Sequence, residues 1–530
     1  MTLRLPCILL SLCLVAAGCS DAGRLRSDGE QAAEDVLQVD AAEVADSGVG
    51  GALIRPVAPP EASDLWPLPA GWRLLASRRA GHSAAELLHT VAGPHEAAIR
   101  LQPFAGVATT FQLELRDGAD ALRAQAFTAP AIYDQVEADR QIVAFLLPPD
   151  ALVSAVDAQG VAVKLPGLLG GSATTMATGE VLLAGGSLYA GGAPCDVDAV
   201  GAPTETLWRY DPADGGLNAF AKLKTARSFH VALPLSPIRL AVLGGQISAT
   251  AAGGMATASV ELIRSDVGAV QVSAQPLSVP RARACGAAVG GRLVIAGGLG
   301  QAGSSAELWD PAIGTVGQPI TLSPPRYDAG CVSARDPANE RDLVFIVGGR
   351  SASGPVNDVV IVAVEDTGLV TFAPLLLPAG PLHQAFVHVP DKSFALLVAG
   401  GFGGGDTGSP SAKSWMNLFS ASSGSSWQPT ADLSTARGCA AAAVLSDGSR
   451  ALLFGGMAAN GEPTAAIDQV MLDGGAKVDL NVALPQPRAG AVAVALLDGT
   501  ILLSGGLALV SGAAKTVDGV LRFAPPPGVP

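Results

Sequence analysis

Short apolar runs, each followed by a turn and then by a glycine doublet, recur along most of the chain. The segment 484–506, LPQPRAGAVAVALLDGTILLSGG, shows two such runs on either side of Asp498-Gly499. Apolar runs of this length, bounded by Gly and Pro, predict β-strands. Doublets end the second run about every 50 residues, at Gly185-Gly186, Gly244-Gly245, Gly297-Gly298, Gly348-Gly349, Gly400-Gly401, Gly455-Gly456 and Gly505-Gly506. A period near 50 residues predicts a repeat architecture of seven units.

A second feature of the repeat is a leucine four residues before an arginine, ahead of the first strand. The pairs are Leu223/Arg227, Leu277/Arg281, Leu322/Arg326, Leu433/Arg437 and Leu484/Arg488. The repeats that begin at Leu165 and Leu377 carry Leu169 and Pro381 at the arginine position. After each doublet come a variable loop, a third strand and a fourth strand. Each repeat therefore predicts a four-stranded unit.

These residues resemble the kelch repeat family. Arg227-Ser228-Phe229-His230 matches the family's R-x-x-H opening, and Trp309-Asp310-Pro311 and Trp427 match its later positions. Most other repeats lack the histidine and the fourth-strand tryptophan, so they are divergent. The resemblance covers about Val161 to Phe523. It implies an all-β protein in which residues 156–530 form a seven-bladed kelch-type β-propeller.

Closure of the propeller is predicted from the two ends of this region. The last repeat supplies strands near 490–497, 500–503 and 517–523, then ends in Pro525-Pro526-Pro527 without a fourth strand. The run Val161–Leu165 (VAVKL) lies just before the first repeat and has strand alternation. We expect this segment to complete the last blade.

The N-terminus has the pattern of an export signal. Arg4 precedes an apolar run, Leu5–Ala17, which is too short to span a bilayer. The segment Val15–Cys19 resembles a bacterial lipobox, with Ala16 where leucine is usual. The resemblance implies that residues 1–18 are removed and that Cys19 is lipidated. The alternative is an ordinary secretion signal. Ser20 in place of aspartate favours the outer membrane over the inner membrane.

Two further regions precede the propeller. Residues 19–63 are rich in Asp and Glu and end in a Gly- and Pro-containing stretch, which predicts a disordered acidic tether. Residues 64–155 contain three predicted strands, at 97–101, 111–115 and 142–146, separated by Gly, Asp and Pro. We expect a small antiparallel β domain with a sandwich-like fold there.

Composition narrows the possible partners. A net charge of −14 argues against nucleic acid, because no basic patch offsets it. Past the N-terminus no apolar run reaches the length of a spanning helix, so contact with the membrane is expected through the lipid anchor alone. Cys195, Cys285, Cys331 and Cys439 form no C-x-x-C pair. The last three lie early in predicted first strands, so we expect buried free thiols there, although an exported location permits disulfides.

Alternating strand direction places the fourth-to-first and second-to-third connections on one face, which is the expected binding face. A set of arginines on that face could bind carboxylates or sulfates: Arg227, Arg281, Arg326, Arg437 and Arg488. The alternative is that each arginine braces neighbouring blades. Asp196 and Asp198, in a long loop, are further ligand candidates, although the other oxygen ligands of a Ca²⁺ site are not evident.

These patterns predict a binding or scaffolding protein that recognises a protein or carbohydrate at the cell envelope. The alternative is a carbohydrate-active enzyme, because some kelch propellers are copper oxidases of galactose, which hold copper with two tyrosines and two histidines. In this chain His230, His383 and His388 lie in the predicted propeller, and His230 is the motif histidine. No hydrolase, zinc-protease or phosphate-loop motif is present. We therefore predict no catalytic residue, metal or cofactor.

Overall fold

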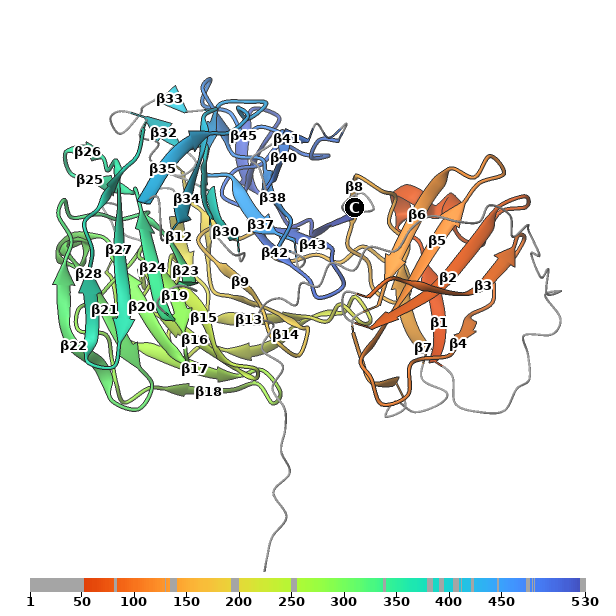
Figure 1. The fold of residues 1–530 in the computed structure, drawn as a ribbon, viewed down its shortest axis with the longest axis horizontal. Coiled ribbons are helices and arrows are strands. Elements are labelled where there is room, and N and C mark those ends of the chain that lie inside the picture. The colour runs from red at the N-terminus through yellow and green to blue at the C-terminus, as the bar shows by residue number, and fades with distance from the viewer. Residues whose placement is uncertain are drawn as a thin grey trace, which may run out of the picture. The chain divides into compact units, whose positions relative to one another are not determined.

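The computed structural model describes residues 52–524 apart from short segments at 81–82, 129, 134–140, 192–199, 249–254, 337–339, 379–384, 390–394, 404–408, 411, 421–423, 446–447, 473–476, 479 and 481. Within these ranges the protein is all-β, with short 3-10 helices such as η1 (Pro60–Leu65) and η3 (Gly300–Ser304). None of the helices in these ranges has the length and hydropathy needed to cross a membrane. Figure 1 shows the strands in chain order.

The N-terminal β domain consists of two sheets. One has the order β4-β1-β7 and the other β3-β2-β5-β6. Their strands are β1 (Ala52–Val57), β2 (Arg73–Ala80), β3 (Glu86–Ala92), β4 (Ile99–Leu101), β5 (Thr109–Arg116), β6 (Leu122–Phe127) and β7 (Gln141–Phe145). Alternate residues of β5, namely Phe111, Leu113 and Leu115, are fully buried in the shared core with Ile54 and Leu74. The three strands predicted in this region correspond to β4, β5 and β7.

Two predictions for this region are corrected. The tether was expected to extend to residue 63, but β1 already belongs to the folded domain because Ile54 and Val57 are buried. The domain was expected to be antiparallel, but β1 pairs in parallel with β7, from Leu53↔Gln141 to Val57↔Phe145. The alternation in Ala52–Val57 is short and lies among acidic and proline residues, so composition concealed it.

Six four-stranded sheets and one five-stranded sheet follow in the described residues, all antiparallel, and they are numbered one to seven in chain order. Sheet one contains β9 (Ser172–Thr175), β10 (Val181–Ala184), β13 (Thr206–Tyr210) and β14 (Leu217–Lys222), and sheet two contains β15 (Val231–Ser236), β16 (Arg239–Leu243), β17 (Val260–Arg264) and β18 (Ala269–Val272). Sheet three contains β19 (Cys285–Val289), β20 (Arg292–Ala296), β21 (Ser305–Asp310) and β22 (Gly314–Thr321). Sheet four contains β23 (Gly330–Asp336), β24 (Arg341–Val347), β27 (Asp358–Glu365) and β28 (Gly368–Thr371), and β29 (Leu375–Leu376) also pairs with β27. Sheet five contains β30 (Ala385–Val389), β31 (Ala395–Ala399), β34 (Ser414–Ser420) and β35 (Gly424–Pro429); sheet six β37 (Ala441–Val444), β38 (Arg450–Phe454), β40 (Ile467–Met471) and β41 (Lys477–Val478); sheet seven β42 (Val492–Ala495), β43 (Ile501–Ser504), β46 (Leu521–Ala524) and β8 (Ala151–Ser154).

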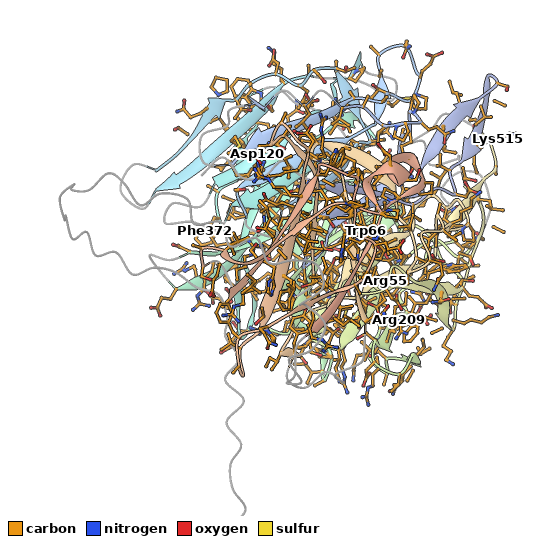
Figure 2. The ribbon with its side chains drawn as sticks, turned by 90° about the vertical axis from the view of Figure 1, so that its right-hand side faces the viewer. Arg55, Trp66, Asp120, Arg209, Phe372 and Lys515 are labelled. Carbon is orange, nitrogen blue, oxygen red and sulfur yellow. A yellow bond between two sulfur atoms is a disulfide. The ribbon has the colours of Figure 1, made fainter. Side chains whose placement is uncertain are left out.

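The first strands of the sheets contact one another in cyclic order. β9 contacts β15, and the contacts continue through β19, β23, β30, β37 and β42, which in turn contacts β9. First strands such as β37 (AAAV) carry small side chains, which close approach between sheets requires. The second strands are buried on both faces, as in β10 (VLLA) and β43 (ILLS), and therefore read as continuous apolar runs. Side chains fill the space between the strands (Figure 2).

Small two-stranded ribbons extend from several connections between second and third strands. They are β11 (Ser187–Tyr189) with β12 (Val200–Pro203), β25 (Arg350–Ser351) with β26 (Gly354–Pro355), β32 (Phe402–Gly403) with β33 (Ser409–Pro410), and β44 (Leu507–Val510) with β45 (Ala513–Thr516); in sheet six β36 (Arg437–Gly438) pairs with β39 (Met457–Ala458). Bridges such as Ser228↔Gln246 and Ala489↔Leu507 join these connections to the segments that precede the first strands. Both sets of connections therefore lie on one face, as the sequence predicts.

The strand that completes sheet seven is not the predicted one. β8 pairs with β46, from Leu521↔Ser154 to Ala524↔Ala151. Val161–Leu165 instead turns back after Gly160 (φ +79), so that Val163 N–H donates to Ala155 C=O at 2.9 Å. Its end forms no strand of this sheet: Lys164 makes an isolated bridge with Gly519, and Leu165 lies in a hydrophobic cluster with Leu502 and Val520. The boundary expected at residue 155 consequently moves to about residue 150.

The cysteines also differ from expectation. Cys285 of β19 and Cys331 of β23 form a disulfide that joins sheets three and four, and Cys439 is disulfide-bonded as well. Small apolar positions at the start of adjacent first strands bring the Cα atoms of Cys285 and Cys331 to 5.4 Å, which suits a disulfide. The expectation of free thiols is therefore wrong for these three residues.

Candidate functional site

The five predicted arginines lie in the interior rather than on the binding face. Each side chain is at most 2% exposed, and four form ion pairs with a carboxylate of the third strand in the same sheet. The pairs and their N–O distances are Arg227–Glu261 at 2.5 Å, Arg281–Glu307 at 3.0 Å, Arg326–Asp358 at 2.5 Å and Arg437–Asp468 at 2.6 Å. Arg488 donates to Gly519 C=O at 3.2 Å. Their surroundings match the bracing alternative, so we do not place them in a ligand site.

Arg281 illustrates how the brace works. Its Nε donates to Glu307 Oε1 at 3.0 Å, and one terminal nitrogen donates to Gly297 C=O at 2.8 Å. The other oxygen of Glu307 accepts the N–H of Ser278, in the linker from sheet two, at 2.9 Å. Burial lowers the pKa of Arg281, and the charge of Glu307 partly offsets this. The brace therefore fixes the chain that enters each sheet.

The glycine doublet joins each sheet to the next. The second glycine donates its N–H to the carbonyl of the next sheet's arginine, as in Gly245 to Arg281 at 2.6 Å and Gly298 to Arg326 at 2.9 Å. A Cβ on Gly244 would lie 2.5 Å from the Arg281 carbonyl oxygen, so a side chain does not fit there. Gly506 makes the corresponding contact with Leu168 C=O, which shows that Leu168, not Leu169, occupies the arginine position of sheet one.

Three other predicted site residues fall outside the described ranges: Cys19, Asp196 and Asp198. His383 also lies outside them, and the side chain of His388, in β30, is not described. Within the described part of the chain, no group of three or more His, Cys, Asp or Glu side chains could hold a metal ion.

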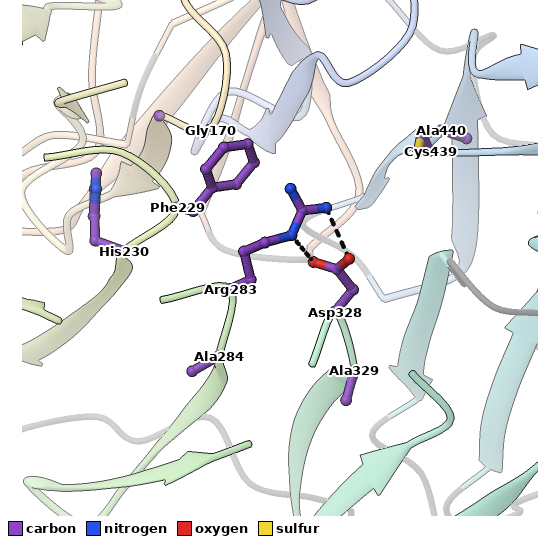
Figure 3. Close-up of a pocket in the computed structure, with 10 residues that line it drawn as sticks. Gly170, Phe229, His230, Arg283, Ala284, Asp328, Ala329, Cys439 and Ala440 are labelled. Carbon is purple, nitrogen blue, oxygen red and sulfur yellow. Dashed lines mark hydrogen bonds and ion pairs between the residues drawn. The ribbon is translucent and has the colours of Figure 1, made fainter. Parts of the chain in front are cut away.

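A pocket of ≈ 300 Å³ lies where the segments entering the first strands of five sheets meet (Figure 3). We call it the central pocket; it is lined by Gly170, Gly171, Phe229, His230, Arg283, Ala284, Asp328, Ala329, Cys439 and Ala440. These residues lie two and three positions after the arginine site of their repeats. Sequence reasoning selected the arginines and missed the pocket, although the repeat register would have aligned these positions.

A series of backbone hydrogen bonds, which we call the backbone circlet, runs along the pocket from sheet to sheet. Phe229 N–H donates to Gly170 C=O at 2.6 Å, Arg283 N–H to Phe229 C=O at 2.9 Å, and Asp328 N–H to Arg283 C=O at 2.9 Å. Gly490 N–H likewise donates to Cys439 C=O at 3.0 Å. Each bond joins equivalent residues of neighbouring sheets. The pocket wall is therefore held in place by main-chain atoms.

Three side chains form a continuous arc over one side of the pocket. The Arg283 guanidinium lies 4.4 Å from the centroid of the Phe229 ring, and its Nε and Nη2 both donate to Asp328 at 2.7 Å. Figure 3 shows Phe229, Arg283 and Asp328 in succession, with Cys439 and Ala440 on the opposite side. A two-point Arg–carboxylate pair fixes the orientation of both groups. The arc thus presents a rigid polar edge to the pocket.

His230 lies behind this arc between sheets one and two. Its Nε2 is 2.8 Å from Ser172 Oγ, and a Cβ on Gly185 would lie 2.9 Å from the ring. Burial, together with the charge of Arg227, lowers the pKa of His230 to about 3. The imidazole is therefore neutral at physiological pH and packs against the glycine doublet, which gives this motif histidine a structural role.

No family model matches this chain, and neither does any curated protein. Among solved structures, the chain is similar to one described as a novel fungal alcohol oxidase with catalytic diversity among the AA5 family, in complex with copper. The two are 18% identical, the match covers 68% of this chain and 75% of that chain, and the TM-score is 0.49.

Proposed function

We propose that this protein is a lipid-anchored, non-enzymatic binding or scaffolding protein that recognises a protein or glycan at the bacterial cell envelope. Its recognition surface is the face that bears the ribbons and the central pocket. The observation that carries the proposal is the pocket itself, which combines a rigid guanidinium–carboxylate pair, an aromatic ring and small residues contributed by five sheets. Concave sites with a few fixed polar groups are the usual form of binding sites.

We further propose that the seven sheets form a kelch-type seven-bladed β-propeller. Three observations support it: the cyclic contacts of the first strands, the repeated glycine-to-arginine hydrogen bonds, and the pairing of β8 with β46. Together they join sheet seven back to sheet one. Such radial repetition leaves only short strand edges exposed.

Export is supported by the sequence and by the cysteines. The lipobox-like segment that ends at Cys19 motivates the lipid anchor, and Ser20 motivates the outer membrane. The Cys285–Cys331 disulfide is of a kind that persists in oxidising compartments such as the periplasm or the cell surface.

A glycan array and an envelope-protein pull-down, both with the detergent-solubilised full-length protein, test the proposed function. We expect saturable binding to one class of partner in at least one assay. Absence of binding in both would contradict the proposal. Bound copper after purification, or turnover on a sugar panel, would instead establish the carbohydrate-active enzyme.

The anchor has its own test. We expect wild type to partition with membranes and Cys19→Ser to remain soluble or unprocessed, because stable anchoring requires more than one lipid chain. Incorporation of labelled fatty acid measures the difference. Identical fractionation of both proteins without label would contradict the lipoprotein assignment.

A further inference from the structure

The residues of the arc have a backbone conformation that favours glycine. Phe229, Arg283 and Asp328 have φ values of 49°, 56° and 52°, and Cys439, at the equivalent position of sheet six, has 53°. In this left-handed region a Cβ crowds the following carbonyl oxygen, so non-glycine residues are strained. The equivalent positions in sheets one and seven are Gly170 (φ +61) and Gly490 (φ +67). Glycine at this position of the repeat therefore avoids the strain, and yet several sheets carry another residue there.

The backbone circlet does not require these side chains. Its hydrogen bonds involve only main-chain atoms, and they also form at Gly170 and Gly490. Glycine at 229, 283 and 328 would keep the same bonds without strain. Strained non-glycine residues persist where a function needs them. The side chains of the arc are therefore best explained by what they present to the pocket.

The ion pair indicates the charge of the ligand. Arg283 and Asp328 side chains are only 4% and 11% exposed. A charged ligand that captured one partner would leave the opposite charge buried without its counter-ion, which is strongly unfavourable. A neutral ligand can bond to both groups without separating them. The site therefore favours a neutral ligand over an acidic or basic one.

The same pair indicates the ligand's polar groups. Arg283 Nε and Nη2 each donate one N–H to Asp328 at 2.7 Å, so the second N–H of Nη2 and the second lone pairs of the carboxylate lie side by side as donor and acceptor. Adjacent hydroxyl groups match this edge, because each hydroxyl both donates and accepts. A pocket of ≈ 300 Å³ accommodates a single ring rather than a long segment.

We propose that Phe229, Arg283 and Asp328 determine the specificity of the central pocket, and that its ligand is a neutral sugar residue with adjacent hydroxyl groups. This inference rests on the proposed binding function and chooses glycan over protein. The strained backbone at the three positions is retained because their side chains contact the ligand and select it.

Two double variants separate strain from recognition. Arg283→Gly/Asp328→Gly and Arg283→Ala/Asp328→Ala remove the same ion pair, but only the glycine version relieves the strain. We expect the glycine double variant to melt at a higher temperature than the alanine one. Both should lose at least tenfold in affinity for neutral methyl hexosides, measured by saturation-transfer NMR on the detergent-solubilised full-length protein. Methyl glucuronide serves as the acidic probe.

Glu340→Gly is the matched control. Glu340 also has a positive φ (51°), but it lies in the turn between β23 and β24, away from the pocket. We expect this variant to melt slightly above wild type and to bind the hexosides normally.

Three results would overturn the inference. Wild type that binds only proteins, or that prefers the glucuronide, would exclude a neutral sugar while leaving a binding function in place. Unchanged hexoside affinity in both double variants would remove Arg283 and Asp328 from recognition. Equal melting temperatures of the two double variants would remove the strain argument, which the thermal measurement tests without any ligand.

Discussion

The junction between sheets two and three and the junction between sheets seven and one are built differently. At the first, Gly245 N–H meets Arg281 C=O at 2.6 Å, and Arg281 is paired with Glu307. At the second, Gly506 N–H meets Leu168 C=O at 3.4 Å, and leucine replaces the arginine. Sheet seven has Arg488, but the Asp518 carboxylate, whose charge partly offsets the burial of Arg488, is mostly exposed and lies 3.6 Å from Lys164 Nζ.

Beside the second junction, sheet seven itself is held together by other interactions. β8 pairs with β46, and Arg522 of β46 forms a buried ion pair with Asp498 and donates to Thr500 Oγ1 at 3.0 Å. Burial raises the pKa of Tyr210 in sheet one, and neighbouring Arg522 partly offsets this. A brace fixes a linker that enters from the preceding sheet. Residues 155–171 link β8 of sheet seven to β9 of sheet one, so the break in the chain lies inside sheet seven, where the pairing of β8 with β46 closes it.

The largest effect is expected from loss of β8. Replacing Ala151–Ser154 with a Gly/Ser segment of equal length removes its ladder and the buried Val153, and it exposes the edge of β46. The loss is comparable with a typical net stability of about 5–15 kcal/mol, so we expect loss of cooperative melting or aggregation. Calorimetry measures it. The same replacement at 161–164 should be milder, and the reverse ranking would restore the originally predicted closing strand.

Breaking a brace should have the next largest effect. Arg281→Met leaves Glu307 buried without its partner, and we expect a loss of about 3–5 kcal/mol in the free energy of unfolding. Adding Glu307→Leu should restore much of it, because no charge is then left uncompensated. Urea denaturation measures both. A double variant as unstable as the single one would mean that the unpaired charge of Glu307 is not the cause of the lost stability.

The neutral His230 should make stability depend on pH. Its pKa is about 3 in the folded state and about 6.5 when unfolded, so the unfolded chain binds the extra proton between these values. Stability is then fully present above pH 6.5 and falls as the pH drops, by about 2 kcal/mol at pH 5. We expect His230→Gln to flatten this part of the urea-midpoint profile. His89→Gln, at an exposed position of β3, should follow wild type.

The smallest effect is expected at the unusual arginine. Burial lowers the pKa of Arg488 to about 10, with the charge of Asp518 partly offsetting this, and substitution removes the bond to Gly519 C=O. We expect Arg488→Met to change the unfolding free energy by no more than about 1 kcal/mol, because removal of a buried charge offsets the lost bond. A cost equal to that of Arg281→Met would show that Asp518 pairs with Arg488 in solution.

The sequence predicted most of the sheets because their apolar periods and glycine doublets are local signals. It misplaced the closing strand because Val161–Leu165 and Ala151–Ser154 both have strand character. The difference lies in a turn, where Asp157 accepts from the N–H groups of Gln159 and Val161 and reverses the chain. The pairing of β8 with β46, which are far apart in the sequence, cannot be recognised from the residues of either strand alone.

The site was misjudged for a related reason. Arginine is conspicuous in an acidic sequence, but whether it faces solvent depends on a carboxylate about 30 residues later, as Glu261 is for Arg227. Phe229, Arg283 and Asp328 share no residue type, so no motif marked them. What they share is a positive φ, a property of the backbone.

The position of β8 early in the sequence limits when sheet seven can fold during synthesis. This strand leaves the ribosome before every other strand of the seven sheets, yet its partner β46 is among the last segments to emerge. Joining the two requires a loop that spans nearly the whole repeat region, which is slow to close. Until then β8 is an unpaired strand. A chain interrupted at any earlier point cannot complete its last sheet, so an open, association-prone intermediate is the state that folding chaperones would meet.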